Sequence, residues 1–407
     1  MQNVRFLNMT QYNNPSFFKF IHDNKNVDSK SLLLKHHGKM MGFPLEFAVV
    51  QIESRKKTES KLPYFLSFDK FIFPDKISAE QSSDQRVAKY HASLVGRGQH
   101  ILDMTSGLGI DAMSMAMADN YVTACELDKN KHDALIHNSS IIELSGFTPV
   151  NCNSVEFIRN SSESFDIIFI DPARRDINNK RTYSFNDCIP DVTSCISDMK
   201  SRSKRIFIKA SPLLDVTKVR DEIDCISKLH LVCVKGECKE LLVEIDNSEC
   251  FKGIRVVDLN DDGMISDIFF DEAELRHGLF TFASKSDLAV GKYLYEPNAG
   301  VMKLNPAKAL CDRYNGLKKL ARNTSLYISD ILYDNFPGRI SIIENIPDNE
   351  ALKSMKGERY NVVSRNYPLT ADELRKKYRI KEGKDKFLYA FRMTENSIPQ
   401  LCLTQRI

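Results

Sequence analysis

The sequence predicts an α/β fold in which a mostly parallel sheet ends in an antiparallel hairpin. Between about residues 100 and 245, apolar runs alternate with amphipathic stretches, a pattern typical of parallel β-α-β units. A glycine-containing turn follows the first apolar run. The last two runs, 229–234 and 241–245, are too close in sequence for a crossover helix, so we expect them to pair antiparallel.

Residues 1 to about 80 are expected to form a helical N-terminal part, because apolar residues recur there at helical spacing. Pro44 is compatible with a helix only near its start, so a helix is expected to begin there. Ser82, Ser83 and Asp84 are candidate caps of a helix over 87–94. The sheet domain is then expected over 81–285.

The elements of that domain follow from the alternation. The expected strands are 101–102, 121–125, 165–170, 205–209, 229–234 and 241–245, and the expected helices are 110–118, 129–144 and 216–228. Residues 250 to about 285 read as further short strands and turns.

The pattern resets near residue 290. The expected elements are an extended segment 293–304, a helix 306–321, a strand 340–346, a helix 349–355, a strand 360–364, a helix 370–378 and a hairpin of 387–393 with 400–405. Thr370 and Glu373 have the spacing of a capping box. This β-α-β-α-β-β succession predicts one or two small ferredoxin-like units, divided here into 286–332 and 333–407.

The glycine turn carries the strongest functional signal. Residues 101–111 read Ile-Leu-Asp-Met-Thr-Ser-Gly-Leu-Gly-Ile-Asp, which is a strand, a tight turn and a helix start. Such a turn lets a nucleotide-like ligand approach the backbone. Glu126 ends the next apolar run, where a carboxylate can accept both hydroxyls of a ribose. A dinucleotide-binding turn would have a third glycine, and Ala112 stands there instead.

Three further motifs are expected near the carboxyl ends of the strands, where open α/β sheets bind ligands. The first is Phe165–Arg175, in which a buried strand runs into Asp171 and Pro172. The second is Lys209 at the end of the next strand, although a plain strand exit explains it equally well. The third is the hairpin turn, where Glu237 or Glu240 can line a pocket mouth, but a solvated turn is favoured.

Bulk composition excludes several classes of protein. The 407 residues are 42% hydrophobic and 27% charged, and no apolar run approaches the length of a membrane span, so a cytoplasmic protein is expected. The ten cysteines include no Cys-x-x-Cys pair, which favours buried thiols over a metal site or disulfides. From residue 301 onwards, 20 Lys+Arg face 12 Asp+Glu, which indicates either an anionic partner or a solvated charged surface.

The glycine turn resembles the loop that binds S-adenosylmethionine (SAM) in class I methyltransferases, whose Rossmann-like sheet also ends in an antiparallel hairpin. The resemblance implies that SAM is the cofactor. It assigns the cofactor contacts to Asp103, Thr105, Gly107, Gly109, Asp111, Glu126, Asn153 and Ser154. Asp103 would face the methionine amino group, and Asn153-Ser154 would lie near the adenine amine. Thr105 replaces the usual first glycine, as in some rRNA and tRNA methyltransferases.

The strand end at Asp171 resembles the methyltransferase motif Asp/Asn-Pro-Pro-aromatic, in which the acid accepts a hydrogen bond from the target amine. Asp171, Pro172 and Arg174 are therefore the candidate catalytic residues. Arg174 replaces the aromatic residue of the motif. Its guanidinium can stack on a base, hold a phosphate or serve as a structural ion-pair partner.

With 295–299, 336–339 and 365–369, these motifs resemble one family as a set. It is the bacterial class I SAM-dependent methyltransferases with a C-terminal THUMP-like domain and a small ferredoxin-like domain, well represented in Bacteroidetes. The resemblance covers about residue 15 to the end. It implies RNA as the partner, by analogy with true THUMP domains.

The candidate substrate-binding residues are Arg175, Lys209, Arg375, Lys376, Lys377 and Tyr378. The last four belong to a basic run that can contact phosphates, with Tyr378 stacking on an unpaired base. A solvated lysine face with a core tyrosine is an equal alternative. The sequence therefore predicts a SAM-dependent methyltransferase of structured RNA (tRNA or rRNA) without a metal. The alternatives are a methyltransferase of proteins or small molecules, and a non-catalytic RNA-binding protein.

Overall fold

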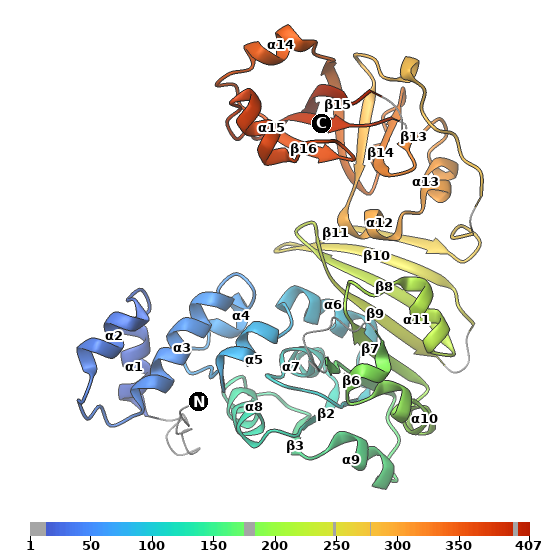
Figure 1. Ribbon diagram of the computed structural model, residues 1–407. Coiled ribbons are helices and arrows are strands. Elements are labelled where there is room, and N and C mark those ends of the chain that lie inside the picture. The colour runs from blue at the N-terminus through green and yellow to red at the C-terminus, as the bar shows by residue number, and fades with distance from the viewer. Residues whose placement is uncertain (1–13, 175–183, 247–249, 277, 394–397) are drawn as a thin grey trace. The chain divides into compact units, whose positions relative to one another are not determined.

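The computed structural model describes residues 14–174, 184–246, 250–276, 278–393 and 398–407. The chain divides into two compact units, each described here by itself. The first unit comprises Met1–His230, Glu240–Phe251 and Asn260–Gly263, and the second comprises Leu231–Lys239, Lys252–Leu259 and Met264–Ile407. Figure 1 shows the course of the chain.

Helices make up most of the described N-terminal part, as predicted. They are α1 (Pro15–Asp23), α2 (Ser29–His36), α3 (Leu45–Thr58), α4 (Pro63–Leu66), α5 (Lys76–Gln81) and α6 (Gln85–Val95). Helix α3 begins directly after Pro44, and Asp84 caps α6 through its side chain. Phe17 and Phe47 are fully buried in the cluster that joins α1 to α3.

A large sheet follows, with helices between its first strands. Its strands are β1 (His100–Asp103), β2 (Tyr121–Glu126), β3 (Phe147–Asn151), β4 (Ile167–Ile170), β7 (Arg205–Ala210), β8 (Ile226–Val234), β9 (Glu237–Asp246), β10 (Gly253–Asn260) and β11 (Gly263–Asp271). The helices are α7 (Ile110–Met117), α8 (Lys129–Ile141), α9 (Ser154–Asn160), α10 (Val192–Arg202) and α11 (Val216–Glu222). Short segments η2 (Phe185–Asp187), β5 (Ala173–Arg174) and β6 (Cys188–Ile189) lie between β4 and α10.

The strand order is β11-β10-β8-β9-β7-β4-β1-β2-β3. Strands β3, β2, β1, β4 and β7 are mutually parallel, and β9 runs antiparallel to β7. Two residues join β8 to β9, which confirms the predicted hairpin. This is the Rossmann-like sheet of the class I methyltransferases. The strand order reverses at β1, which has β2 on one side and β4 on the other. Open α/β sheets bind ligands at the carboxyl ends of the strands at such a reversal.

Burial explains why β4 reads as a continuous apolar run. All four of its residues are buried, because helices cover both faces of a parallel sheet. Ile167 and Phe169 pack with Ala112, Met115 and Leu135 of α7 and α8. The helix expected over 216–228 is shorter than predicted, because α11 ends at Glu222. Residues 226–228 already belong to β8, and most side chains of that strand are buried in the sheet.

The second unit contains a seven-stranded sheet with the order β13-β14-β12-β15-β18-β17-β16. Its elements are η3 (Lys285–Asp287), β12 (Tyr293–Pro297), α12 (Ala299–Leu304), α13 (Ala307–Arg313), β13 (Lys318–Ala321), β14 (Thr324–Ser329), β15 (Gly338–Asn345), α14 (Asn349–Ser354), β16 (Asn361–Arg365), α15 (Ala371–Tyr378), β17 (Lys386–Phe391) and β18 (Gln400–Arg406). The β-α-β-α-β-β succession from β15 onwards confirms the α+β prediction.

Two expectations for this unit are wrong. The segment 293–304 is extended only to Pro297, because the Asn298 side chain accepts a hydrogen bond from the Val301 amide and starts α12. The segment 306–321 is helical only to Arg313. Gly316 has a φ of +85°, and β13 follows it. The apolar residues after the turn serve the sheet rather than the helix.

The two faces of the seven-stranded sheet are packed differently. On one face, Leu388 and Leu403 pack with Leu352 of α14 and Leu374 of α15. The opposite face has its own apolar cluster, which includes Tyr389. The alternation of side chains along each strand separates the two sets.

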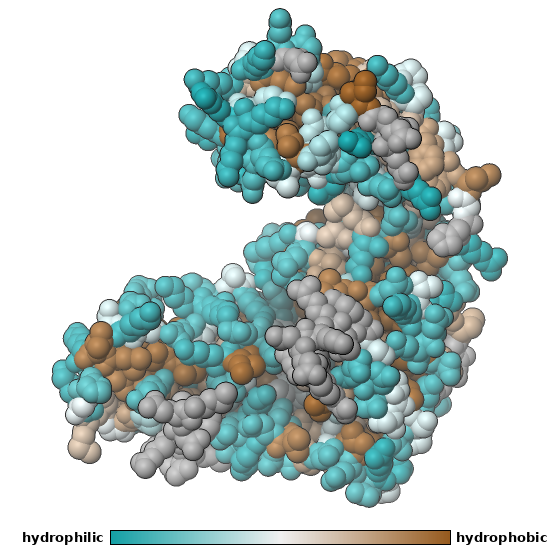
Figure 2. All heavy atoms as spheres, in the orientation of Figure 1, coloured by the Kyte–Doolittle hydropathy of each residue, from teal (hydrophilic) through white to brown (hydrophobic). Residues whose placement is uncertain are grey.

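Figure 2 shows mainly hydrophilic residues on the viewed face, with hydrophobic residues gathered over α1 and α2. Leu34 and Met40 are among the exposed apolar side chains of this N-terminal region. In the part of the chain that the structure describes, no helix is both long and apolar enough to cross a bilayer.

Candidate active site

The carboxyl edge of the sheet brings three of the predicted acidic residues to neighbouring strand ends. Asp103 ends β1, Glu126 ends β2 and Asp171 directly follows β4. The register of the parallel strands places Asp103 opposite Ala124 on one side and opposite Phe169 on the other. The three carboxylates therefore lie along the edge where the strand order reverses.

Thr105 ties the glycine turn to the strand end at Asp171. Its hydroxyl oxygen accepts a hydrogen bond of 2.7 Å from the Asp171 amide. The Thr105 amide donates to Asp103 Oδ1 at 3.0 Å. A glycine at this position has no side chain to make the first of these bonds. Thr105 thus holds the turn and the candidate catalytic residue together.

Glu126 supports the other side of the same turn. Its Oε2 accepts from the Gly107 amide at 2.9 Å, and its Oε1 accepts from the Asp128 amide at 2.7 Å. A carboxylate oxygen has further lone pairs, so both oxygens can still accept ribose hydroxyls. Gly107 has a φ of +54°, and a Cβ built on it would meet no atom within 4 Å. The backbone here faces open space of the kind that an adenosine requires.

The Asp103 carboxyl is 2% exposed. Burial raises its pKa to about 7, and the nearby Asp111 and Asp171 carboxylates add to the increase. A buried carboxyl that is repelled by its neighbours favours a cationic ligand. This observation fits the ammonium and sulfonium groups of SAM.

Asn153 and Ser154 lie beyond the end of β3. The Asn153 side chain caps α9 by accepting from the amides of Val155 and Glu156, and Ser154 is buried at the first position of that helix. Glu126 and Asn151 are paired in register, so this helix start lies next to the strand end that carries Glu126.

Lys209 is buried at the carboxyl end of β7 and joins several predicted residues. Its Nζ lies 2.6 Å from Asp171 Oδ2, 3.3 Å from Asp111 Oδ2 and 3.9 Å from Glu240 Oε2. It also donates to Ser83 Oγ at 2.7 Å, and Ser83 in turn donates to Asp111. Burial alone would lower the Lys209 pKa, but the three carboxylates raise it well above its usual value. The ammonium therefore stays charged.

His91 of α6 completes this buried cluster. Its Nδ1 lies 2.8 Å from Asp111 Oδ1 and its Nε2 lies 2.5 Å from Glu240 Oε1. Burial opposes protonation of the ring, but the Glu240 and Asp111 carboxylates outweigh it and raise the His91 pKa to about 9. The same two cations, Lys209 and His91, overcome burial at Asp111 and hold its pKa well below the usual range.

Sequence reasoning missed part of this cluster. His91 and Ser83 were not site candidates, although His91 lies in α6, which leads into β1, and Ser83 lies just before that helix. Glu240 was expected in a solvated turn and is instead 6% exposed, because its side chain points to His91. Glu237 is exposed, as expected. The signal for Glu240 was its position directly before the predicted apolar strand 241–245, where an unpaired acid would be unstable.

The structure describes only some of the remaining candidates of the Asp171 motif. Pro172 is buried, and the Arg174 backbone belongs to β5, which pairs antiparallel with β6. Arg175 lies outside the described residues. Among the residues that the structure does describe, no group of three or more His, Cys, Asp or Glu side chains is arranged to hold a metal ion.

The basic run of the second unit lies on α15. Lys376 and Lys377 are exposed, and Arg375 Nη1 lies 3.3 Å from Asp372 Oδ1. Tyr378 is half-buried against the cluster that contains Leu374, and Lys377 Nζ lies 5.1 Å from its ring centroid. The tyrosine is therefore partly a packing residue.

The chain is similar to known proteins in two respects: parts of it match models of protein families, and its fold matches solved structures. A model of a ferredoxin-like domain matches residues 293–337, and a THUMP domain-like model matches residues 349–405. No curated protein matches this chain significantly.

Among solved structures, the chain is similar to the crystal structure of a "putative methyltransferase" from Porphyromonas gingivalis W83, with a TM-score of 0.85 and 25% identity. This likeness covers 98% of the chain and 99% of that protein. TrmK of M. capricolum, in complex with S-adenosyl-homocysteine, has a TM-score of 0.32 and 13% identity over 40% of this chain and 68% of that one. The chain thus has the architecture that its motifs indicate, that of the bacterial proteins in which a class I methyltransferase fold is followed by a ferredoxin-like and a THUMP-like domain.

Proposed function

We propose that this protein is a SAM-dependent methyltransferase that methylates structured RNA. The observation that carries the proposal is the direct link between the glycine turn and Asp171, made by the Thr105 hydroxyl at 2.7 Å. This bond joins the turn proposed to bind the cofactor to the residue proposed to bind the methyl acceptor, which supports a shared site at this edge. The fold shared over nearly the whole chain with the Porphyromonas protein, described as a "putative methyltransferase", supports the methyl-transfer part of the proposal.

The residues at this edge suit SAM. Glu126 would hold the ribose, the open backbone at Gly107 would admit the adenosine, and the buried Asp103 would face the methionine ammonium. Asn153 and Ser154 would lie towards the adenine. SAM supplies a methyl group on a cationic sulfur, ready for attack by a nucleophile.

Asp171 would orient the methyl acceptor. Its Oδ2 is held by Lys209, whose charge is fixed by burial among carboxylates. The other oxygen, Oδ1, is then directed by this pairing and can accept a hydrogen bond from an amine or hydroxyl of the substrate. Methyl transfer requires in-line alignment more than proton transfer, so such positioning supplies much of the rate. Lys209 thus acts on the substrate through Asp171.

RNA as the substrate class is supported by the second unit. Its THUMP domain-like match covers α15, which carries the exposed Lys376 and Lys377. Lysines on one helix face neutralise phosphates without reading sequence, so they suit remote anchoring of a structured RNA.

The test combines labelled SAM with a variant of Asp171. We expect the wild-type protein to transfer tritium from methyl-labelled SAM to RNA, rather than to protein or DNA, in extracts of a strain that lacks this gene. Asp171→Ala should bind SAM normally in calorimetry and lose transfer by roughly 100-fold or more. The matched control is Asp224→Ala, which removes an exposed carboxylate of the same unit.

Two outcomes would contradict the proposal. Absence of SAM binding by the wild-type protein would remove the cofactor assignment altogether. Transfer by Asp171→Ala at the wild-type rate would remove the role of that carboxylate.

A further inference from the structure

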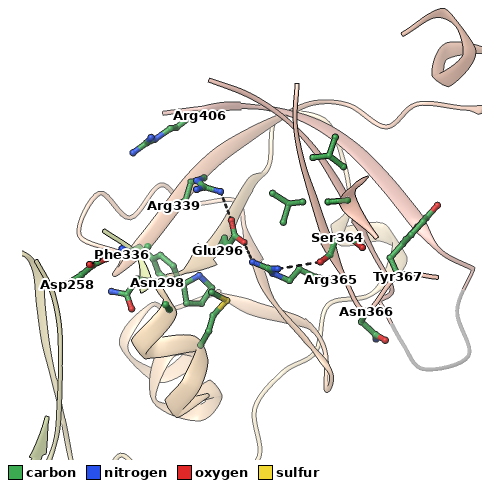
Figure 3. Close-up of a pocket in the computed structure, with 18 of the residues that line it drawn as sticks. Asp258, Glu296, Asn298, Phe336, Arg339, Ser364, Arg365, Asn366, Tyr367 and Arg406 are labelled. Carbon is green, nitrogen blue, oxygen red and sulfur yellow. Dashed lines mark hydrogen bonds and ion pairs between the residues drawn. The ribbon is translucent and has the colours of Figure 1, made fainter. Parts of the chain in front are cut away.

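A second site lies wholly within the second unit. Three motifs that methyl transfer does not use, 295–299, 336–339 and 365–369, meet around one pocket of about 1160 Å³ (Figure 3). Two of them belong to strands β12 and β15, which pair so that Glu296 lies opposite Arg339. The third extends from the end of β16.

Glu296 is the centre of this pocket and is 6% exposed. Its Oε2 accepts from Arg339 Nη1 at 2.8 Å and from Tyr389 Oη at 3.0 Å, and its Oε1 accepts from Arg365 Nη2 at 2.7 Å. Figure 3 shows both guanidinium groups turned toward this one carboxylate. Glu296 therefore fixes the positions of two arginines.

The charges of this arrangement do not cancel. Two guanidinium groups share one carboxylate, so one positive charge is in excess. The Arg365 guanidinium also keeps N–H donors: its Nε has no partner among the described atoms, and its Nη1 reaches the Ser364 carbonyl at 3.4 Å. Arg406 also lines the pocket and forms no ion pair with a described residue.

The backbone of the pocket wall brings β12, which carries Glu296, close to β15, which carries Arg339. A Cβ on Gly338 would lie 2.1 Å from the Glu296 carbonyl oxygen, so only glycine lets β15 approach β12 here. The acids that also line the pocket include Asp258, which Figure 3 shows away from the arginines. The lining as a whole has four arginines against three carboxylates, since Asp334 and Arg392 also belong to it, so one positive charge is in excess.

We propose that this pocket binds a nucleotide through its phosphate. Pre-positioned guanidinium groups match the oxygens of a phosphate in fork geometry, and their remaining N–H donors need an anion. The pocket is much larger than a phosphate alone and is also lined by the half-buried Tyr367, next to which a base can lie. The proposal is independent of methyl transfer.

The experiment uses the full chain and three probes. Calorimetry measures the binding of inorganic phosphate and of adenosine monophosphate, and fluorescence anisotropy measures a short labelled single-stranded oligoribonucleotide at fixed salt. Arg406→Gln should weaken nucleotide binding about fivefold, since it removes a cation that does not support Glu296. Arg365→Gln should weaken it about tenfold, because it removes one of the two guanidinium groups that Glu296 positions.

The control is Arg97→Gln, an exposed arginine of the other unit, which should bind every probe as the wild type does. Thermal melting confirms that each variant is folded. Monophosphate binding that Arg406→Gln weakens locates a free nucleotide site in this pocket rather than at the candidate adenosine site of the first unit. Binding by the oligomer alone, weakened by the same variant, locates a site for a polynucleotide. The proposal is overturned if neither nucleotide probe binds, or if folded Arg365→Gln and Arg406→Gln both bind the nucleotide probes as tightly as the wild type does.

Discussion

Thr105 shows how one side chain adapts the glycine turn of this protein. The sequence alone identifies it as a replacement for a glycine. The structure gives the replacement a reason, since its hydroxyl accepts from the Asp171 amide. The residue that departs from the glycine motif thus links the glycine turn to the Asp171 motif. The sequence does not show this link, because it depends on the distance between two loops.

The raised pKa of Asp103 predicts how the proposed SAM binding responds to pH. With a pKa of about 7, this carboxyl is largely protonated at pH 6 and largely ionised at pH 8. The ionised form attracts the ligand cation, so the affinity for SAM should rise several-fold over this range. Calorimetry at pH 6, 7 and 8 measures it. Asp103→Asn should bind more weakly and show only the titration of the ligand; an unchanged pH profile in that variant would refute the assignment.

His91 predicts a pH dependence of stability at the alkaline side. Its pKa is raised from 6.5 to about 9 in the fold, so its contribution is fully present below pH 6.5 and is lost as the pH rises through 9. The shift corresponds to at most roughly 3 kcal/mol. Urea unfolding between pH 6.5 and 9.5 should therefore show falling stability in the wild type. His91→Gln should show a shallower fall, and equal slopes would exclude this role.

At the scale of secondary-structure elements, strand pairing determines which candidate residues come together. The carboxyl ends of β1, β2 and β4 bring together acids that are far apart in sequence, and this follows from parallel pairing alone. The alternation of apolar runs was enough to predict it. In contrast, the ends of α11 and α13 were misplaced, because the burial of β8 and β13 in their sheets overrode the helical periodicity.

The contact between β12 and β15 gives a prediction for an element. Gly338→Ala places a Cβ 2.1 Å from a backbone oxygen of Glu296, so the strands must separate. We expect a loss of about 1–3 kcal/mol in the free energy of unfolding. Gly278→Ala is the matched control, because the added Cβ meets only the flexible side chain of Lys308. Equal stability of the two variants in urea unfolding would contradict the close approach.

At the scale of the whole molecule, the charge is unevenly distributed. From residue 301 onwards, basic residues outnumber acidic ones, while the chain as a whole has a formal net charge of only +3. Such a distribution favours association with an anionic polymer through the basic part.

This asymmetry predicts strongly salt-dependent RNA binding. If roughly four to six phosphates are neutralised, raising salt from about 0.1 to 0.2 M should weaken binding by roughly tenfold. Replacing Lys376 and Lys377 of α15 by Gln should lower the slope of log affinity against log salt by about 2. The control replaces the exposed Lys25 and Lys30 in the same way. Equal slopes for both double variants would place the phosphate contacts elsewhere.

The sequence by itself determined the fold class, and it predicted the edge of the sheet that carries the candidate site and the cofactor proposed for it. Periodicity and a few fixed spacings carry this information locally, as in the glycine turn and the strand that ends at Asp171. Only the tertiary structure decided the roles of Lys209, His91 and Glu240. The effect of these charges depends on burial, which excludes water, and on distances of a few ångströms between the charged groups. Neither burial nor distance can be read directly from the sequence.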